Sequence, residues 1–463
     1  MRKGSIGIFA VLIMMLVASV LFVLLETTRC KEIHRLSNLQ TQVALESAFA
    51  NYQSTLWEDY GLLGCEVSQL EDHVLEGANY KKETSLSGLN LLKFDVEDFE
   101  TQGYTLLTDG GGLVYEQAVA ASMKDTMLYG AAKEIFNQYE VIKNLETQSG
   151  WSPLWLTNGL SQELADENDD IENPMIEVIN IQNKGILELL IEDTNEISNK
   201  SLNIRDAVSH RDLAKGKNPV IPENDWLNKV LLQQYILQNM SNYSMQVSDD
   251  GMDYEVEYVI AGKGSDAENL KYVVNRLLFL REMTNFLYLT SNPIKIKEAG
   301  SIALALAGVS VNPLVVEIVK MGIVAAWAFG ESVLDVRALL QGKKIPLLKS
   351  ESTWTLEISQ IGSIDKGYLT AKECENGLSY QQYLGVMLLF LQDGELSMRA
   401  MDVQEAAIRM KDEMDGFRMD EILVQAKMRI DYYSLPVFLS FYQLDVAFPE
   451  IYCIKTEKAY GYY

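Results

Sequence analysis

The sequence has few of the residue types that most often catalyse reactions or bind metals. Its 463 residues include only three histidines and four cysteines. The histidines, His34, His73 and His210, lie far apart and lack a metal-ligand spacing. The H-E-x-x-H, G-x-S-x-G and G-x-x-x-x-G-K-S/T patterns are all absent. We therefore predict no catalytic residues, no metal site and no cofactor, and we expect that the protein is not an enzyme.

The four cysteines are too dispersed for a structural zinc site, in which close pairs of ligands are usual. Four cysteines allow three complete disulfide pairings, and the sequence does not choose among them. A disulfide is compatible with a domain outside the cytoplasm, and buried free thiols are equally compatible with this sequence. The pairing therefore stays open for Cys30, Cys65, Cys374 and Cys453.

Positive charge is also scarce. The chain has 39 Lys and Arg against 65 Asp and Glu, which gives a net charge of −26. A polyanion would be repelled by this field, so the composition excludes a nucleic-acid partner. Such acidity is typical of an exposed domain that stays soluble.

Charge is missing altogether from residues 4–25. The apolar run from Ile6 to Leu25 has 20 residues, and a helix of that length spans about 30 Å, the thickness of bilayer hydrocarbon. No small-residue cleavage pattern follows it, so we predict a retained anchor in the lipid bilayer through residues 6–25 rather than a cleaved signal. Residues 301–330 form shorter apolar runs, which we expect to be buried core helices.

The charges that flank this run do not fix its orientation. Positively charged residues favour the cytoplasmic side of a span. Basic residues stand on both sides of this one: Arg2 and Lys3 before it, and Arg29, Lys31 and Arg35 after it. The count is a tie, so charge alone leaves the topology open.

The helix is predicted to continue beyond the membrane. No proline, and no glycine except Gly7, interrupts residues 5–60, and Gly61 offers a C-terminal stop. Apolar residues recur there at spacings of three and four, which predicts an apolar stripe. The stripe either covers the core of the protein itself, the commoner case, or meets another helix.

Three segments alternate with the period of two that is typical of half-buried strands: residues 254–258, 354–358 and 424–432. One polar face in each favours an antiparallel sheet covered on one side by helices. Helical periodicity predicts helices over residues 225–243, 267–290, 379–392 and 395–411. The fold class is therefore α+β: an N-terminal transmembrane helix that continues into a long helix, then a largely helical domain with an antiparallel sheet.

The predicted organisation has four parts. Residues 1–30 are the transmembrane anchor, and residues 31–196 are a helical stem and membrane-proximal region. Residues 197–224 are polar, contain Gly216, Pro219 and Pro222, and are predicted to be a linker or mobile loop. Residues 225–463 form the α+β extracytoplasmic domain.

Two stretches of sequence carry family resemblances. KGSIGIFA, residues 3–10, before an apolar span resembles the start of pilin-like membrane proteins of tight-adherence (Tad, Flp-type) pilus systems. Residues 44–63, 254–278 and 327–339 are similar to a bacterial family of unknown function, and this likeness runs over most of the chain. It implies a single-span envelope protein, with the large domain outside, associated with Tad-like pilus or secretion genes. It implies no known active site.

The pilin resemblance implies leader processing between Gly4 and Ser5, because the pilin peptidase cuts after the glycine of a basic-glycine leader. The fifth residue of a mature type IV pilin is glutamate, whereas here it would be Phe9. The pilin carboxylate is thought to pair with a neighbouring subunit, and an unpaired one is costly in lipid. Phe9 therefore disfavours a bulk polymerising pilin and favours an accessory or anchored partner.

The span also contains four small residues, and close packing at such residues drives helix pairing in lipid. We predict helix–helix contacts in the membrane through Gly7, Ala10, Ala18 and Ser19.

The expected function is that of a non-catalytic, membrane-anchored structural or assembly component of a Tad-like pilus or secretion system. It would be a single-pass protein of the bacterial cell membrane, and its partners would be the lipid bilayer and other membrane or pilin-like proteins. The alternative is an extracytoplasmic sensor or ligand-binding protein on the same single-span anchor.

Overall fold

The computed structural model describes residues 3–79, 91–123, 136–144, 173–182, 185–191, 193–248, 251–307, 313–366, 369–439 and 452–463. The chain divides into two compact units. Unit 1 contains residues 1–122, 213–223 and 418–463, and unit 2 contains residues 123–212 and 224–417. The chain therefore leaves unit 1 for unit 2 twice, whereas the sequence analysis expected contiguous parts with boundaries at 196/197 and 224/225.

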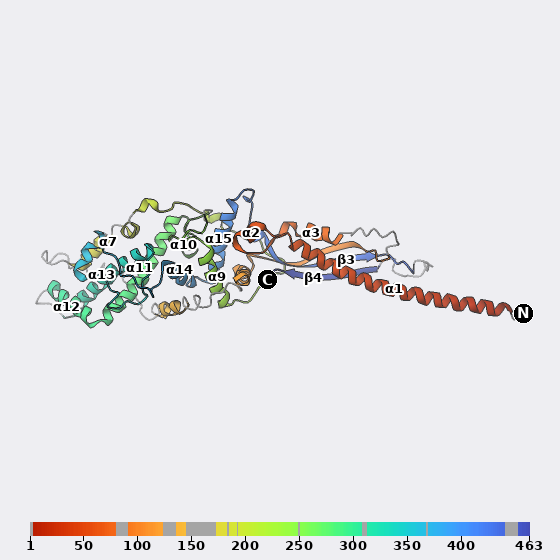
Figure 1. Ribbon diagram of the computed structural model, residues 1–463, viewed down its shortest axis with the longest axis horizontal. Helices are drawn as coiled ribbons and strands as arrows, with labels where there is room; N and C mark the ends of the chain where they lie inside the picture. Colours follow the sequence, from red (N-terminus) through yellow and green to blue (C-terminus); the bar gives the residue numbers. More distant parts are fainter. Residues whose placement is uncertain are drawn as a thin grey trace. The chain divides into compact units, whose positions relative to one another are not determined.

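Unit 1 begins with the longest helix of the chain, which is drawn in red in Figure 1. Its helices are α1 (Lys3–Phe49), α2 (Ser54–Tyr60), α3 (Val67–Asn79) and α4 (Leu113–Met123), with short 3-10 turns η1 (Asp109–Gly112) and η5 (Met419–Glu421). Its strands are β1 (Cys65–Glu66), β2 (Asp95–Leu106), β3 (Ile422–Ser434) and β4 (Tyr452–Gly461).

The four strands form one antiparallel sheet around β3. Strand β2 pairs with β3 along one edge, while β1 and β4 pair with successive parts of the other edge. The pairing runs from Asp95↔Tyr433 at one end of β2 to Leu106↔Leu423 at the other, with three register shifts between. The strand predicted at 424–432 is confirmed, and it is the central strand.

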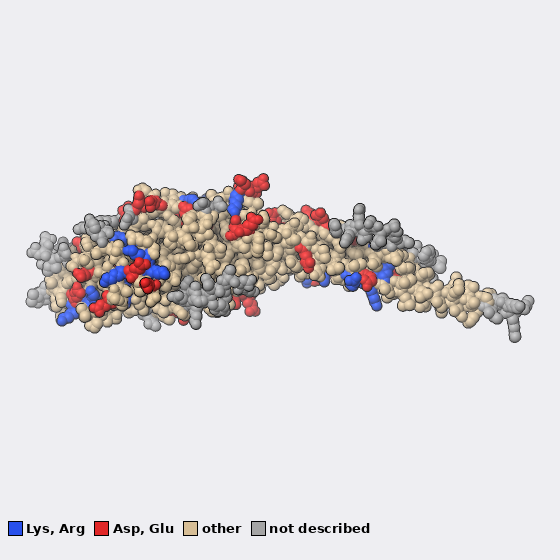
Figure 2. Space-filling view, in the orientation of Figure 1, with Lys and Arg blue, Asp and Glu red and all other residues tan. Residues whose placement is uncertain are grey.

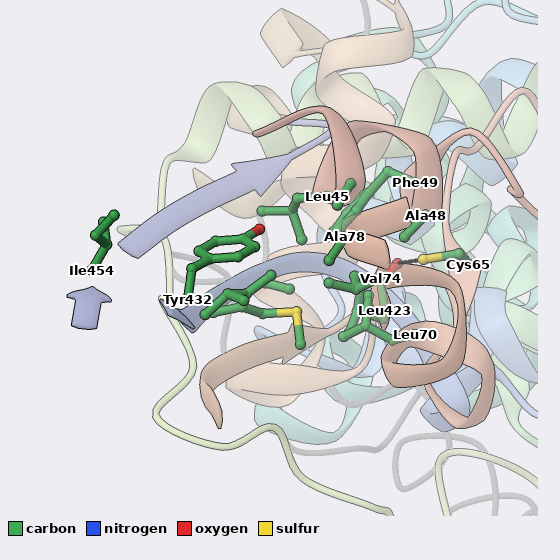
Figure 3. Packing of buried hydrophobic residues seen from close by; sticks show 14 of the residues in the cluster. Leu45, Ala48, Phe49, Cys65, Leu70, Val74, Ala78, Leu423, Tyr432 and Ile454 are labelled. Atoms are coloured by element: carbon green, nitrogen blue, oxygen red, sulfur yellow. Dashed lines mark hydrogen bonds between the residues drawn. The ribbon is translucent and has the colours of Figure 1, made fainter. Parts of the chain in front are cut away.

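One face of the sheet is apolar because β3 alternates. Met428, Ile430 and Tyr432 are buried against the second half of α1 and against α3 (Figure 3), and the intervening Lys427 and Arg429 point to the other face. Thr41 of α1 reaches the sheet as well, since its hydroxyl lies 2.6 Å from that of Thr456. The expected arrangement, an antiparallel sheet covered on one side by helices, is confirmed.

The helix that begins the chain stops earlier than predicted, at Phe49 rather than Tyr60. The ring of Phe49 is buried between those of Tyr460 and Tyr462, and the Tyr462 hydroxyl donates to the Phe49 carbonyl. This contact satisfies a carbonyl that the helix end leaves open. A second helix, α2, follows and ends at Gly61 with φ 66°, as the glycine predicted.

Residues 197–224, predicted to be a linker or mobile loop, are divided between the two units. Residues 213–223 belong to unit 1 and run along β2. The Tyr104 amide donates to the Lys217 carbonyl at 2.8 Å, and the Val220 amide donates to the Thr105 hydroxyl at 2.9 Å. These hydrogen bonds hold residues 217–220 beside β2.

Unit 2 is helical. Its helices are α7 (Pro174–Gln182), α8 (Ile186–Leu190), α9 (Trp226–Asn239), α10 (Glu255–Ala261), α11 (Asp266–Ser291), α12 (Pro293–Ala307), α13 (Pro313–Leu340), α14 (Tyr380–Leu389) and α15 (Glu395–Arg409), and its 3-10 turns are η2 (Thr194–Glu196), η3 (Ile204–Asp206) and η4 (Ile358–Lys366). Helix α13 packs against α11, α12 and α7. All four helices predicted in this region are confirmed, with shifts of a few residues at their ends.

Two predicted strands in unit 2 are wrong. Residues 255–258 form the start of α10, with Tyr254 as its N-cap. The two glutamates that suggested a polar face, Glu255 and Glu257, are buried together with Val256 and Tyr258. Residues 354–357 are in neither a helix nor a strand, and Ile358 begins η4. The amides of Thr355 and Leu356 donate instead to the Glu331 carboxylate, which replaces a neighbouring strand as acceptor.

Candidate functional site

The first half of α1 is apolar around its whole circumference and packs against nothing that the structure describes. Its mean hydropathy reaches 3.2, and none of that stretch is buried. In Figure 2 the projecting helix is uncharged until basic and acidic side chains appear at its junction with the rest of unit 1. A helix that is hydrophobic all round belongs in a core or a membrane. This one is long and apolar enough to cross a bilayer, and a signal sequence would have the same character.

The predicted contact residues lie on different sides of this helix. At 100° per residue, Gly7, Ala10 and Ala18 fall within an arc of about 80°, whereas Ser19 is about 100° away from Ala18. The Ser19 hydroxyl donates to the Leu16 carbonyl at 2.8 Å, so it needs no external partner. The structure therefore brings together three of the four predicted residues.

Gly4 and Ser5, where the pilin resemblance implies processing, are in the first turn of α1. Processing at that bond stays a prediction. Phe9, the residue in place of the pilin glutamate, is largely exposed on the apolar half of the helix.

A buried ion pair stands directly after the apolar run. Arg29 Nη1 lies 2.7 Å from Glu26 Oε1, and the two side chains are only 4% and 2% exposed. Arg29 also donates from Nη2 to the Ser434 hydroxyl at 2.7 Å and from Nε to the Leu91 carbonyl at 2.5 Å. Charge-assisted hydrogen bonds of this kind are the strong ones. They fix the end of β3 and the chain before β2 to α1.

Glu26 completes the attachment. Its Oε2 accepts from the amides of Val437 at 3.2 Å and Phe438 at 2.7 Å, just after β3. The apolar half of α1 is thus joined to the sheet through one continuous helix. The contacts of Glu26 and Arg29 stabilise this connection at the turn where the helix first becomes buried.

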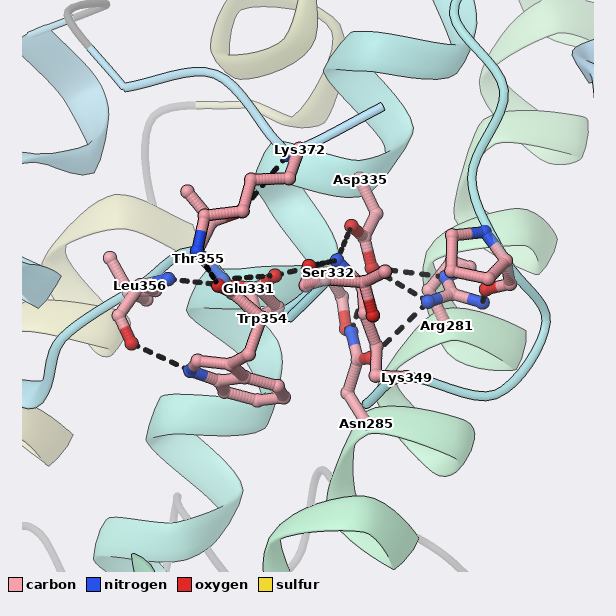
Figure 4. A network of polar contacts seen from close by, with 12 residues as sticks. Arg281, Asn285, Glu331, Ser332, Asp335, Lys349, Trp354, Thr355, Leu356 and Lys372 are labelled. Carbon is pink, nitrogen blue, oxygen red and sulfur yellow. Dashed lines mark hydrogen bonds and ion pairs between the residues drawn. The ribbon is translucent and has the colours of Figure 1, made fainter. Parts of the chain in front are cut away.

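Unit 2 contains a second, larger cluster of buried charges, between α11, α13 and the chain that follows α13 (Figure 4). Arg281 Nη2 lies 2.8 Å from Asp335 Oδ2, and Lys349 Nζ lies 2.6 Å from Glu331 Oε1 and 2.7 Å from Asp335 Oδ1. All four side chains have no exposed surface. Two cations and two anions balance, so the cluster is neutral.

The charged groups of this cluster also form hydrogen bonds with backbone groups of the chain that follows α13. Arg281 donates to the carbonyls of Pro346 and Leu347 at 2.9 and 2.8 Å, and Glu331 accepts from the amide of Leu356 at 2.7 Å. Burial would raise the pKa of Asp335, but the Arg281 guanidinium and the Lys349 ammonium hold it below its ordinary value. The groups satisfy one another away from solvent, which is the arrangement of a structural network rather than a reactive site.

Helix α10 carries two buried acids that form no ion pair within the part of the chain that the structure describes. Glu257 Oε1 accepts from the Tyr380 hydroxyl at 2.7 Å and the Tyr243 amide at 3.0 Å, and burial nevertheless raises its pKa to about 7. Burial likewise raises the pKa of Glu255 to about 8, against a hydrogen bond from the Ser241 amide at 2.7 Å. Raised pKa values mark functional sites in some proteins, yet both carboxyls are buried within unit 2.

Unit 2 also has an open crevice of about 640 Å³ at the start of α9. Its walls combine aromatic rings with charged groups, since Trp226 lies 4.9 Å from Phe136 between ring centroids and Lys229 lies 3.1 Å from Asp393. Aromatic walls with a few placed polar groups are the usual character of a small-molecule site.

The described segments contain neither a cluster of metal-binding side chains nor a disulfide. Within them, no three His, Cys, Asp or Glu side chains lie close enough to hold one metal ion. All four cysteines fall in these segments, and each is a free thiol. Burial raises the pKa of the Cys65 thiol to about 11, so it is unreactive at neutral pH.

Comparison with known proteins identifies the family. The model of a family of unknown function, DUF5702, matches residues 165–434, which is more than half of the chain. The chain belongs to this family. The match covers most of unit 2 and continues through β3, while α1 lies outside it. No curated protein and no solved structure matches the chain.

In this DUF5702 member, sequence reasoning missed the residues that attach the apolar helix to the sheet. Arg29 was counted only as a flanking charge, although it is buried. The available signal was the opposite charge three residues earlier, at Glu26, because residues three apart share a helix face. Glu331 and Asp335 gave a similar signal, since two acids one turn apart inside an apolar helix need buried partners.

Proposed function

We propose that this DUF5702 protein is a non-catalytic, membrane-anchored structural or assembly component of a Tad-like pilus or secretion system. In this proposal residues 6–25 cross the cell membrane once and the two units lie outside the cytoplasm. The main observation in favour of this proposal is the structure of α1. Its apolar half continues without a break into the helical segment that packs against the sheet. The resemblance of residues 3–10 to pilin-like Tad proteins supports the same function.

The outer face of α1 supports assembly with a second helix. Leu39 and Val43 are 51% and 49% exposed, although they belong to the apolar stripe. Gly7 and Val43 are 36 residues apart, which is ten turns at 3.6 residues per turn, so they share one face. Ala10, Ala18 and Leu39 fall within about 60° of that face. Buried residues such as Ile33, Ala44 and Ala48 point toward the sheet instead.

In the membrane half of α1 this face carries small residues, and beyond the membrane it carries exposed apolar residues. Small residues let two helices approach closely in lipid, and exposed apolar side chains favour burial against a partner in water. One straight helix of a neighbouring protein could follow both halves. A pilin-like membrane protein has such a helix, which is why we assign the partner to that class.

Crosslinking in native membranes tests the proposal. A photoreactive residue at Ala10 should give adducts with a membrane or pilin-like protein. The matched control is Leu16, which lies about 180° from Gly7 and should give adducts with lipid. Lipid adducts from both positions would reduce the helix to a tether and contradict the assembly function.

A second experiment separates anchoring from assembly. Replacing residues 5–25 with an unrelated apolar span of equal length should keep the protein in the membrane and abolish association with its partner. Protease added to intact cells should digest both units, because the proposal places them outside. Complete protection would place them in the cytoplasm instead.

The alternative, an extracytoplasmic sensor or ligand-binding protein, has one observation in its favour, the crevice beside Trp226. Trp226→Ala distinguishes the two functions. It should leave partner crosslinking from Ala10 unchanged if assembly is the function, and it should abolish signalling or ligand capture if the crevice is the site.

A further inference from the structure

The loop that follows β3 is unusually apolar. Residues 435–439 read Leu-Pro-Val-Phe-Leu, and Leu435 is 59% exposed. The four residues that follow Leu435 are half-buried. Five consecutive apolar residues are unusual in a surface loop, since such loops are normally polar. A second loop at the same end of the sheet, before β2, exposes Leu91 and Leu92.

Both loops are fixed to α1 at the point where its apolar run ends. Glu26 binds the amides of Val437 and Phe438, and Arg29 binds the carbonyl of Leu91. The Ser434 hydroxyl joins the two loops, since it accepts from Arg29 and donates to the Lys93 carbonyl at 2.7 Å. The loops therefore cannot move along the helix axis independently of the span.

Their depth follows from the helix geometry. Glu26 is the next residue after Leu25, and Arg29 is four residues after it, so at 1.5 Å per residue they lie about 1.5 and 6 Å beyond the apolar run. The interfacial layer on each side of the hydrocarbon is roughly 5–8 Å thick. Loops bound to Glu26 and Arg29 lie within that layer when residues 6–25 fill the hydrocarbon.

We infer that residues 435–439, together with Leu91 and Leu92, form a second lipid-binding surface, which enters the interfacial layer of the membrane beside α1. The inference rests on the proposed anchoring of residues 6–25. The lipid is favoured over a protein occupant because this surface is continuous with the apolar surface of α1. Lys31 and Lys93, both exposed near the same turn, suit the phosphate groups at that depth.

This second contact would fix the orientation of the whole of unit 1. One helix alone is free to rotate about its axis and to tilt in a bilayer, and interfacial anchors restrict both motions. A loop on one side of α1 would hold the sheet against the membrane. At 100° per residue, Gly7 and Val43 lie about 40° from Arg29 and Ala10 about 100° from it, so this face lies beside the loops. Fixing the loops would therefore also fix the direction in which this face meets a neighbouring helix.

Site-specific crosslinking of the full chain tests the surface. The protein is placed in vesicles of phosphatidylcholine and phosphatidylglycerol, with a photoreactive residue in place of the exposed Leu435. A covalent adduct with the mass of one phospholipid is expected. The matched control is Tyr460, a partly exposed residue of β4. It lies eight strand positions from Tyr452, roughly 26 Å along the sheet, and should give no lipid adduct.

Leu16 in the span separates the two possible failures. Lipid adducts from Leu16 but not from Leu435 would show an anchored protein whose loop stays in water, which overturns this inference alone. An absence of lipid adducts from both would overturn the anchoring and the inference together. Adducts between Leu435 and a second copy of the chain would assign the surface to protein and also overturn it. Phe438→Ser offers an independent check, because it should weaken the Leu435 lipid adduct and leave that of Leu16 unchanged.

Discussion

Helices α1 and α13 are both long and apolar enough to cross a membrane, yet the structure gives them opposite surroundings. The apolar stretch of α1 has a mean hydropathy of 3.2 and none of it is buried in the protein. That of α13 has a mean hydropathy of 1.6 and is 56% buried. Two helices that are both long and apolar enough to span a membrane can therefore differ completely in how much of them the protein buries.

The placement of charge separates the two helices. In α1 no charged residue stands between Lys3 and the pair Glu26 and Arg29. In α13, Glu331 and Asp335 interrupt the apolar sequence itself and find cations in the core. A charge inside an apolar helix is tolerated where protein partners surround it, and such partners identify a core helix.

Removing a partner from α13 should have the largest effect. Asp335→Ala leaves Arg281 buried without its anion and removes one of the two anions beside Lys349, so we expect the free energy of unfolding to fall by about 3–5 kcal/mol. Urea unfolding followed by the fluorescence of the buried Trp327 and Trp354 measures it.

The matched control lies on the same helix. Glu317 and Lys320 form an ion pair at 2.6 Å, but Glu317 is largely exposed, so Glu317→Ala should cost less than about 1 kcal/mol. Equal losses from the two variants would mean that burial of the charges does not distinguish α13 from a surface helix.

Removing the buried ion pair between Glu26 and Arg29 of α1 should have an intermediate effect on stability. Arg29→Ala removes three hydrogen bonds and leaves Glu26 buried, so local stability should fall by about 2–3 kcal/mol. Amide hydrogen exchange of residues 434–438 should then accelerate roughly 30- to 150-fold, at tenfold per 1.4 kcal/mol. The control is Arg35→Ala, which removes only an exposed pair with Glu32 and should leave this exchange unchanged.

The pH dependence of Glu257 should give the smallest effect, and it shows what burial without a cation does. Its pKa is about 7 in the folded protein against an ordinary 4.5, so as the pH rises the unfolded chain loses its proton first. Stability that is fully present below pH 4.5 is therefore lost until about pH 7, by about 2 kcal/mol between pH 5 and pH 7.

Glu257→Gln should remove this part of the pH dependence. Tyr380→Phe keeps the carboxyl but removes the hydroxyl that lowers its pKa, so the decline should extend to higher pH. Parallel pH profiles for the wild type and Glu257→Gln would show that Glu257 is already ionised in the folded protein, as Asp335 is.

The sequence led to correct elements where a pattern of apolar residues had a single physical cause. The apolar run of α1 and the nine-residue alternation of β3 led to correct elements, because each has a single face or a single environment to satisfy. The α+β class and four helices of unit 2 followed from the same reasoning. Gly61 and Gly262 end helices with positive φ, as glycines do.

The errors occurred where a polar residue was buried. Glu255 and Glu257 imitated the polar face of a strand, and only the fold shows that Ser241 and Tyr243 supply their hydrogen bonds. The extended chain at Thr355 lacked a strand partner because Glu331, 24 residues earlier, binds it. Contacts at such separations leave no local pattern, which is also why the attachment of β3 to Glu26 and Arg29 was not predicted.

The insertion of unit 2 has a consequence for biosynthesis. Helix α1 ends at Phe49, but β3, the central strand of the sheet that packs against it, begins at Ile422, which is 373 residues later. Ribosomes add about 5–20 residues per second, so the half of α1 that will face the sheet waits roughly 20–75 s for its partner strands. During that time its apolar stripe is open to chaperones, to the membrane surface or to another nascent chain. Any assembly that begins on this helix can therefore begin before the protein is finished.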